Sequence, residues 1–190
     1  LQSMEGTANS IDFFKDAVAS GLMPLLTTLA KSHKQDDTRR LALEVIASFI
    51  EGKPKAMSKV PGFIEQTVNI CVQFLMELND DVEEWAAEDD DEAEDEDMFT
   101  NGKEVIDRLS GAMAKAEKFP QVMEVLKPAI ATLFQGTNWK QSVAGMALIS
   151  QIAEYVDDDV TITQMIAAIH AQLGASHVRV RHAAWSALAQ

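Results

Sequence analysis

Apolar residues recur along most of this chain at the spacing of an α-helix. One group lies between Val122 and Phe134, where members follow each other at intervals of three and four residues and so share one side of a helix. Three further groups have the same spacing, and alternating strand patterns are absent. The sequence therefore predicts an all-α fold. The four stripes are Val122, Val125, Leu126, Ala129, Ile130, Leu133 and Phe134; Ile64, Val68, Cys71, Leu75 and Leu78; Leu41, Val45 and Phe49; and Ile162, Ile166, Ile169 and Leu173.

Glycine and proline residues indicate where these helices change. They gather, with other turn-forming residues, at positions 51–57, 100–102, 118–120, 135–138 and 173–177. Pro24 is different because it stands inside a helical pattern, where a proline either kinks the helix or starts a new one.

Three stretches of the sequence can be aligned as copies of one unit, beginning at Asp37, Trp139 and Arg179. The last two begin 40 residues apart, and each follows another amphipathic helix. A unit of two helices and about 40 residues has the length of a HEAT repeat. The predicted fold is a HEAT-repeat α-solenoid of about four helix pairs in a right-handed superhelix, in which each pair contacts only its neighbours. The aligned positions are Ala42, Ala144 and Ala184, and Ile46, Leu148 and Leu188.

The first two copies are too far apart for two plain units. They begin 102 residues apart, about 20 more than two units need. An acidic run accounts for the excess, so we expect an insertion between the two helices of the second unit. The predicted units are 8–52, 53–118 with the acidic insertion at 79–101, 119–156, and a truncated unit at 157–190.

Negative charge is concentrated in that insertion. From Asp80 to Asp97 there are 13 acidic residues and no Lys or Arg, whereas the whole chain has a net charge of −14. Unpaired carboxylates are too costly to bury, so we expect the run to be exposed and mostly disordered in the free protein. It favours basic partners and argues against nucleic acid, which requires clustered Lys and Arg.

The candidate partner-binding residues are those of the acidic run together with its tryptophan. A solvated spacer that only improves solubility remains the alternative, and the run lacks the ligand spacing of an EF-hand calcium loop. The residues are Asp80, Asp81, Glu83, Glu84, Trp85, Glu88, Asp89, Asp90, Asp91, Glu92, Glu94, Asp95, Glu96 and Asp97.

Several aromatic and basic residues have more than one possible role. Trp85 either packs on neighbouring helices or stacks on a Lys or Arg of a cargo protein. Trp139 and Trp185 are expected to pack within or between repeats. Arg179 and Arg181 either join successive repeats through charges at the helix start or bind an anion.

Other classes of protein are disfavoured. The single cysteine, Cys71, cannot form an internal disulfide, which fits a reducing compartment, and no apolar segment is long enough to cross a bilayer. No catalytic motif, cofactor site or metal-ligand set is present, since the four histidines lack the tight Cys and His spacing of zinc sites. The three residues before Met4 and the open helical pattern at Gln190 suggest an excised piece of a longer chain.

The ordered motifs of the chain resemble one known family. "RRLALEVIASFIE", an acidic loop with a tryptophan, "NWKQSVAGMALISQIAEYVDD" and "HVRVRHAAWSALAQ" are similar to segments of the importin-β superfamily of nuclear transport receptors, especially its karyopherin beta-three (importin five type) branch. The resemblance covers essentially the whole chain.

The resemblance implies a function. Such a receptor would act as a monomer that shuttles between cytoplasm and nucleus, binding basic localisation signals of cargo, the GTPase Ran with GTP, and Phe-Gly nucleoporins. The acidic loop would contact Ran or cargo, and no enzyme activity or cofactor is expected. The alternative is a HEAT-repeat scaffold subunit of another complex, in which the acidic run is a solvated spacer.

Overall fold

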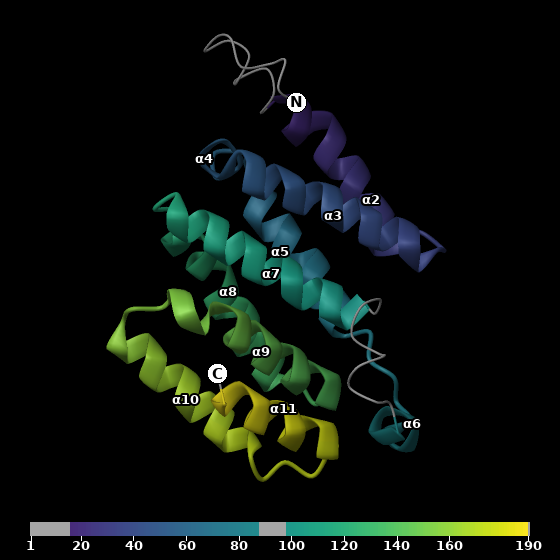
Figure 1. Ribbon diagram of the computed structural model, residues 1–190, viewed down its shortest axis with the longest axis vertical. Helices are drawn as coiled ribbons and strands as arrows, with labels where there is room; N and C mark the ends of the chain where they lie inside the picture. Colours follow the sequence, from purple (N-terminus) through teal and green to yellow (C-terminus); the bar gives the residue numbers. More distant parts are fainter. Residues whose placement is uncertain (1–15, 88–97, 190) are drawn as a thin grey trace.

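The computed structural model describes residues 16–87 and 98–189, and within these ranges the chain is helical and has no strand. The all-α prediction is confirmed. The elements, labelled as in Figure 1, are the π-helix η2 (Val18–Leu22), α2 (Met23–Ser32), α3 (Asp36–Gly52), α4 (Pro54–Met57), α5 (Phe63–Leu75), α6 (Val82–Ala87), α7 (Met98–Lys115), α8 (Phe119–Gln135), α9 (Trp139–Ile152), the 3-10 helix η3 (Ala153–Tyr155), α10 (Asp159–Gln172) and α11 (Val178–Leu188).

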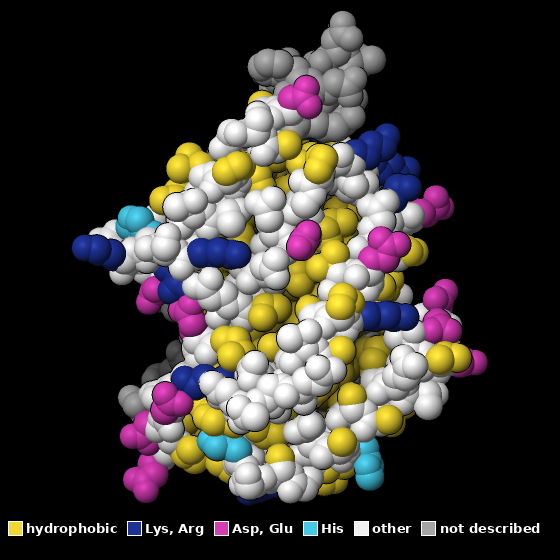
Figure 2. All heavy atoms as spheres, turned by 180° about the vertical axis from the view of Figure 1, so that it is seen from behind, with side chains coloured by type: hydrophobic (Ala, Val, Ile, Leu, Met, Phe, Trp, Pro, Cys, Tyr) yellow, Lys and Arg dark blue, Asp and Glu magenta, His cyan; other side chains and the backbone are white. Residues whose placement is uncertain are grey.

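The longer helices form antiparallel pairs that are stacked along the long axis of the molecule (Figure 1). The pairs are α2 with α3, α5 with α7, α8 with α9, and α10 with α11; α3, α7, α9 and α11 also pack side by side in that order. On the reverse face, apolar side chains run through the middle and most charged side chains lie toward the edges (Figure 2). We propose that each pair is one repeat unit.

Two prolines and one capping motif show how local sequence shapes the helices. Pro24 does not start a new helix: the backbone is helical without a break from Asp16 to Ser32, and Pro24 follows directly on the π-helix η2. A proline inside a helix removes one backbone hydrogen bond, and the wider π-turn is the local irregularity that accompanies it here. The Asn138 side chain accepts a hydrogen bond from the Lys140 N–H at 3.0 Å, and Gln141 Oε1 accepts one from the Asn138 N–H at 3.1 Å. These reciprocal bonds cap the first turn of α9. Pro128 lies within α8, inside the apolar stripe from Val122 to Phe134 that predicted one continuous helix.

The predicted helix break at 100–102 is wrong, because α7 begins at Met98 and continues through Gly102. The predicted end of the insertion at 101 is therefore too late. Gly102 serves a close approach between helices: a Cβ placed there would lie 3.1 Å from the Cys71 carbonyl oxygen and 3.2 Å from Phe74 Cβ on α5. The glycine thus lets α7 pack against α5 rather than ending a helix.

The apolar stripes are only partly correct as a description of the core. All five residues of the stripe from Ile64 to Leu78 are buried. In the stripe through Leu41, Val45 and Phe49 are partly buried against the core, but Leu41 is 64% exposed, and the fully buried face of α3 carries Ala42 and Ile46. Those two were marked by the repeat alignment, which identified the packed face better than hydrophobicity did. Ile166 is also mainly exposed.

No helix in the described ranges has the length and apolar character needed to cross a membrane.

Candidate partner-binding site

The acidic run leaves the second helix pair through a turn of hydrogen-bonded polar residues. Asn79 Oδ1 accepts a bond from the Asp81 N–H, and Asp81 Oδ1 accepts one from the Glu83 N–H, each at 2.9 Å. Such side-chain-to-backbone bonds favour a helix start, and α6 begins at Val82. The expectation of disorder is therefore wrong for Val82–Ala87.

The described acids of the run are exposed, as predicted for Asp80, Asp81 and Glu83. Trp85 is half-buried. The remaining predicted acids lie outside the described residues, as does the side chain of Glu84; they are Glu88, Asp89, Asp90, Asp91, Glu92, Glu94, Asp95, Glu96 and Asp97.

Trp85 packs against α11. The guanidinium carbon of Arg179 lies 5.0 Å from the centre of the Trp85 ring and 5.3 Å from that of Trp139, within the range of cation–π attraction. The His182 ring meets Trp85 edge-on at 5.3 Å. Arg179 Nη1 also donates a hydrogen bond of 2.7 Å to the Asn79 carbonyl. Of the two interpretations for Trp85, the structure shows packing on a neighbouring helix.

Trp139 and Lys140, at the start of α9, complete this arrangement. The His177 ring stacks on Trp139 with a centroid separation of 4.1 Å and an interplanar angle of 6°. Lys140 Nζ lies 3.0 Å from Asp80 Oδ1, although that carboxylate is 78% exposed and the ion pair contributes little by itself. We call Asn79, Asp80, Trp85, Trp139, Lys140, His177, Arg179 and His182 the root cluster.

The structure corrects two expectations about the last repeat, the restriction of contacts to neighbouring pairs and the packing of Trp185. Arg179 joins the insertion of the second pair to α11 of the fourth, so contacts are not limited to neighbouring pairs. Arg181 Nη1 donates to the carbonyls of Ala175 and Ser176, at 2.8 and 2.9 Å, and so stabilises the turn before α11. The expectation that Trp185 packs within or between repeats is wrong for the part of the chain that the structure describes. Its side chain is 62% exposed there.

The root cluster predicts a pH dependence of stability. Burial lowers the pKa of His177, and the charges of Arg179 and Arg181 lower it further, whereas Asp80 acts in the opposite direction. The unfolded chain binds the proton near the ordinary value of 6.5 but the folded chain resists it. Stability that is present above this pH should decline as the pH falls below it.

Urea unfolding at about pH 7.5 and about pH 5.5, on either side of the ordinary histidine pKa, measures this effect. The native chain should have the lower midpoint at the acidic pH, and His177→Gln should reduce the difference. His170→Gln on α10 is the matched control, because His170 is exposed and outside the root cluster. An equal pH dependence in the native and His177→Gln chains would contradict the assignment.

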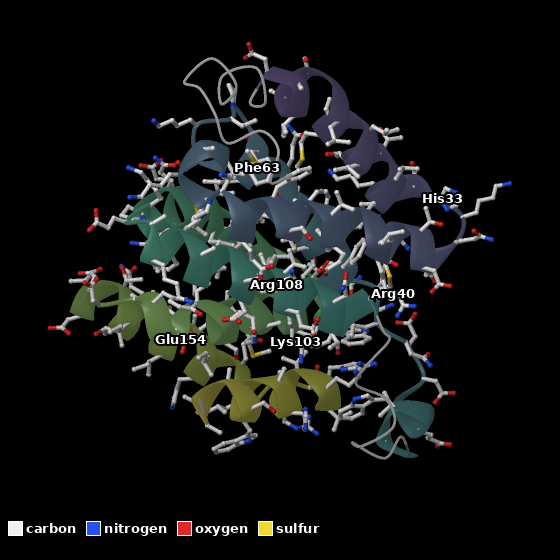
Figure 3. The ribbon with its side chains drawn as sticks, turned by 45° about the horizontal axis from the view of Figure 1, so that its top comes forward. His33, Arg40, Phe63, Lys103, Arg108 and Glu154 are labelled. Atoms are coloured by element: carbon white, nitrogen blue, oxygen red, sulfur yellow. The ribbon has the colours of Figure 1, made fainter. Side chains whose placement is uncertain are left out.

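A second polar surface lies between α3 and α7 and was not found from the sequence. Arg108 of α7 forms ion pairs with Glu44 at 2.7 Å and Glu51 at 2.8 Å, both on α3 (Figure 3). These contacts raise the pKa of Arg108 and hold that of Glu51 below its usual range. The bidentate pairs fix the two helices side by side.

Beside these ion pairs is an open groove. Asn101 Oδ1 is buried there with no hydrogen-bond partner in the structure, and Leu41 is exposed at its rim. Two of the acidic side chains in the lining are already paired, Asp37 with Arg40 and Glu44 with Arg108, so Glu104 is the acid that favours a basic ligand. The lining residues are Asp37, Arg40, Leu41, Glu44, Thr100, Asn101 and Glu104.

No three His, Cys, Asp or Glu side chains in the two described ranges are grouped as ligands for a metal ion.

Comparison with known proteins identifies the family. The sequence profile described as an importin repeat matches residues 23–117, which is half of the chain. The chain belongs to the importin-repeat family. The predicted membership of the importin-β superfamily is thereby confirmed.

Relatives of this importin-repeat chain are much longer. The probable importin-5 homolog of Dictyostelium discoideum is 26% identical over 121 residues, which is 63% of this chain and 11% of that protein. Among solved structures, Kap121p bound to RanGTP matches with a TM-score of 0.79 and 20% identity, and Kap121p bound to Nup53p with 0.77 and 19%. Both matches cover 95% of this chain and 19% of the other chain. The solenoid fold is confirmed.

Proposed function

We propose that this chain is part of a nuclear import receptor that shuttles between cytoplasm and nucleus and acts by binding rather than catalysis. Membership of the importin-repeat family supports this. Kap121p, whose fold the chain shares, has been crystallised with RanGTP, with Nup53p and with Pho4p. The partners of the receptor would be Ran, cargo proteins with basic signals, and Phe-Gly nucleoporins.

We further propose that the acidic segment, Asp80 to Asp97, contacts either Ran or a basic cargo signal. The observation that carries this is the placement of its first part: the root cluster holds α6 while Asp80, Asp81 and Glu83 remain exposed to solvent. Concentrated negative charge on a fixed support attracts a basic surface and speeds encounter. In the alternative, a scaffold subunit of another complex, the same charge would only solvate the chain.

Binding measurements distinguish these functions. The full chain is titrated with RanGTP, with a Lys-rich signal peptide and with a Phe-Gly repeat peptide at several salt concentrations. A receptor should bind RanGTP or the basic peptide, with an affinity that falls as salt rises, because solvent-exposed charges are screened. A chain that binds none of the three at low salt would contradict the receptor function and favour the scaffold.

The groove between α3 and α7 is proposed as a second contact for a basic signal. A Lys or Arg of the ligand could pair with Glu104 and could compete with Arg40 for Asp37. Leu41 provides an apolar contact at the rim.

Charge reversal in this groove should weaken the binding of the Lys-rich peptide. Glu104→Lys places a positive charge where the ligand is positive, so we expect affinity to fall about tenfold at low salt, the effect of about 1.4 kcal/mol. Glu65→Lys is the matched control, because Glu65 is exposed on α5, away from the groove. Isothermal titration calorimetry measures both. Equal losses in the two variants would show only a general charge effect.

We propose that Phe-Gly nucleoporins contact α2 and α10, the first helices of the first and fourth pairs. Leu25 on α2 and Val160 and Ile166 on α10 are at least half exposed. Scattered apolar side chains of this kind could accept phenylalanine rings.

A further inference from the structure

A single guanidinium joins three parts of the chain that are distant in sequence. Arg179, near the start of α11, lies over Trp85 of α6 and Trp139 of α9, and it donates to the carbonyl of Asn79, 100 residues earlier. Units of a solenoid ordinarily contact only the next unit. Here a residue of the fourth helix pair holds the insertion of the second.

We propose that Arg179 is the positioning residue of α6, the described first part of the acidic segment. Arg179 holds α6, from which the acidic run continues, against α9 and α11. It thereby couples the position of α6 to the orientation of the fourth helix pair relative to the second. Any benefit of this positioning for partner binding rests on the function proposed above. The positioning of α6 by Arg179 does not depend on that function.

α6 depends on such a contact for its order. A helix of six residues is too short to be stable in water by itself. Of its described side chains, Glu83 and Ala86 are exposed, Val82 is half-buried, and Trp85 is half-buried against Arg179 and His182. The root cluster therefore supplies tertiary contacts that α6 lacks locally.

The chemistry of this contact is particular to arginine. The planar guanidinium can stack on two indole rings while one nitrogen donates to a carbonyl, which a lysine ammonium cannot reproduce. The ion pair of Lys140 with Asp80, just before α6, is largely exposed. Exposed pairs of this kind hold a segment only weakly.

The contact also constrains the stack. Trp139 begins α9 in the third pair, and Arg179 lies on α11 in the fourth. A rotation between the second and fourth pairs would separate Arg179 from Trp85 or from Asn79. A partner that moves α6 would therefore favour a different angle between the pairs. The size of this shift in the equilibrium is limited by the difference in the partner's affinity for the two angles.

Distances between spin labels test both parts of the proposal in the full chain. Labels at Ala86→Cys on α6 and Ala167→Cys on α10 report the position of α6; labels at Ser48→Cys on α3 and Ser186→Cys on α11 report the stack. All four positions are exposed. The natural cysteine, Cys71, is fully buried and its pKa is raised by burial, so it should not compete for the label.

With Arg179 present, each pair of labels should give one narrow distance. With Arg179→Ala the distribution should broaden for both pairs, and amide exchange in 79–87 should accelerate about tenfold, the factor for a contact of this strength. Arg179→Lys should behave like Arg179→Ala. Arg181→Ala is the matched control, because Arg181 lies on the same helix and donates to the carbonyls of Ala175 and Ser176 in the turn before it; both distances should stay narrow.

Trp85→Leu keeps the test decisive if Arg179→Ala fails to fold, since it removes one face of the contact and leaves α11 intact. Narrow distances in both Arg179→Lys and Trp85→Leu would overturn the positioning role. A broadened α6 distance with an unchanged α3–α11 distance would overturn the coupling to the stack. These measurements contain no partner, so they stand whether or not the chain binds RanGTP or a basic peptide.

Discussion

Neutralising the acidic run should slow the association of the chain with the basic partner proposed above, Ran or a cargo signal, at least tenfold at low salt. Replacing the nine acids from Glu88 to Asp97 by Asn and Gln changes the formal net charge from −14 to −5. Steering by such a charge concentration accelerates encounter by about 10 to 1,000-fold. The association rate with RanGTP and with a Lys-rich peptide, measured by stopped flow at several salt concentrations, should fall for one of them, and its salt dependence should flatten.

A charge-conserving variant serves as the control for this prediction. Replacing Asp89, Asp90, Asp91, Asp95 and Asp97 by Glu retains every negative charge, so the rate and its salt dependence should be unchanged. If the neutralised chain associates with both ligands as fast as the native chain, the run is a solvated spacer and the scaffold function gains support. If the Asp-to-Glu variant is impaired as well, specific geometry rather than steering is responsible.

The second large effect concerns the interface between α5 and α7. Phe74→Ala should destabilise the chain by about 3–5 kcal/mol, because truncation of a buried phenylalanine removes apolar burial and leaves a cavity. Phe74 is fully buried, lies 5.1 Å beneath the Arg39 guanidinium, and faces the closely packed Gly102. Since domains are stable by only about 5–15 kcal/mol, this loss should be evident in urea unfolding followed by circular dichroism.

Leu41→Ala is the matched control for the core. Both substitutions truncate a large apolar side chain, but Leu41 is 64% exposed and should change stability by about 0.5 kcal/mol or less. A similar loss in the two variants would mean that the assigned packing of α3 and α5 is wrong.

The repeat alignment explains why so much of the fold could be predicted. A helix is defined by contacts three and four residues apart, so its presence is visible in local spacing. The small-then-large pattern at Ala42 and Ile46 repeats because each pair packs on the next one. It identified buried residues on α3 where the apolar stripe through Leu41 did not.

The sequence by itself determined the helices, the family motifs and the exposure of Asp80, Asp81 and Glu83, because helix periodicity and the cost of burying charge act locally. The tertiary structure alone decided that α7 runs through Gly102, that Arg108 binds two acids of α3, and that Arg179 lies between Trp85 and Trp139. These features join residues up to 100 positions apart. Their geometry depends on how the helix pairs are placed in space, which no local pattern encodes.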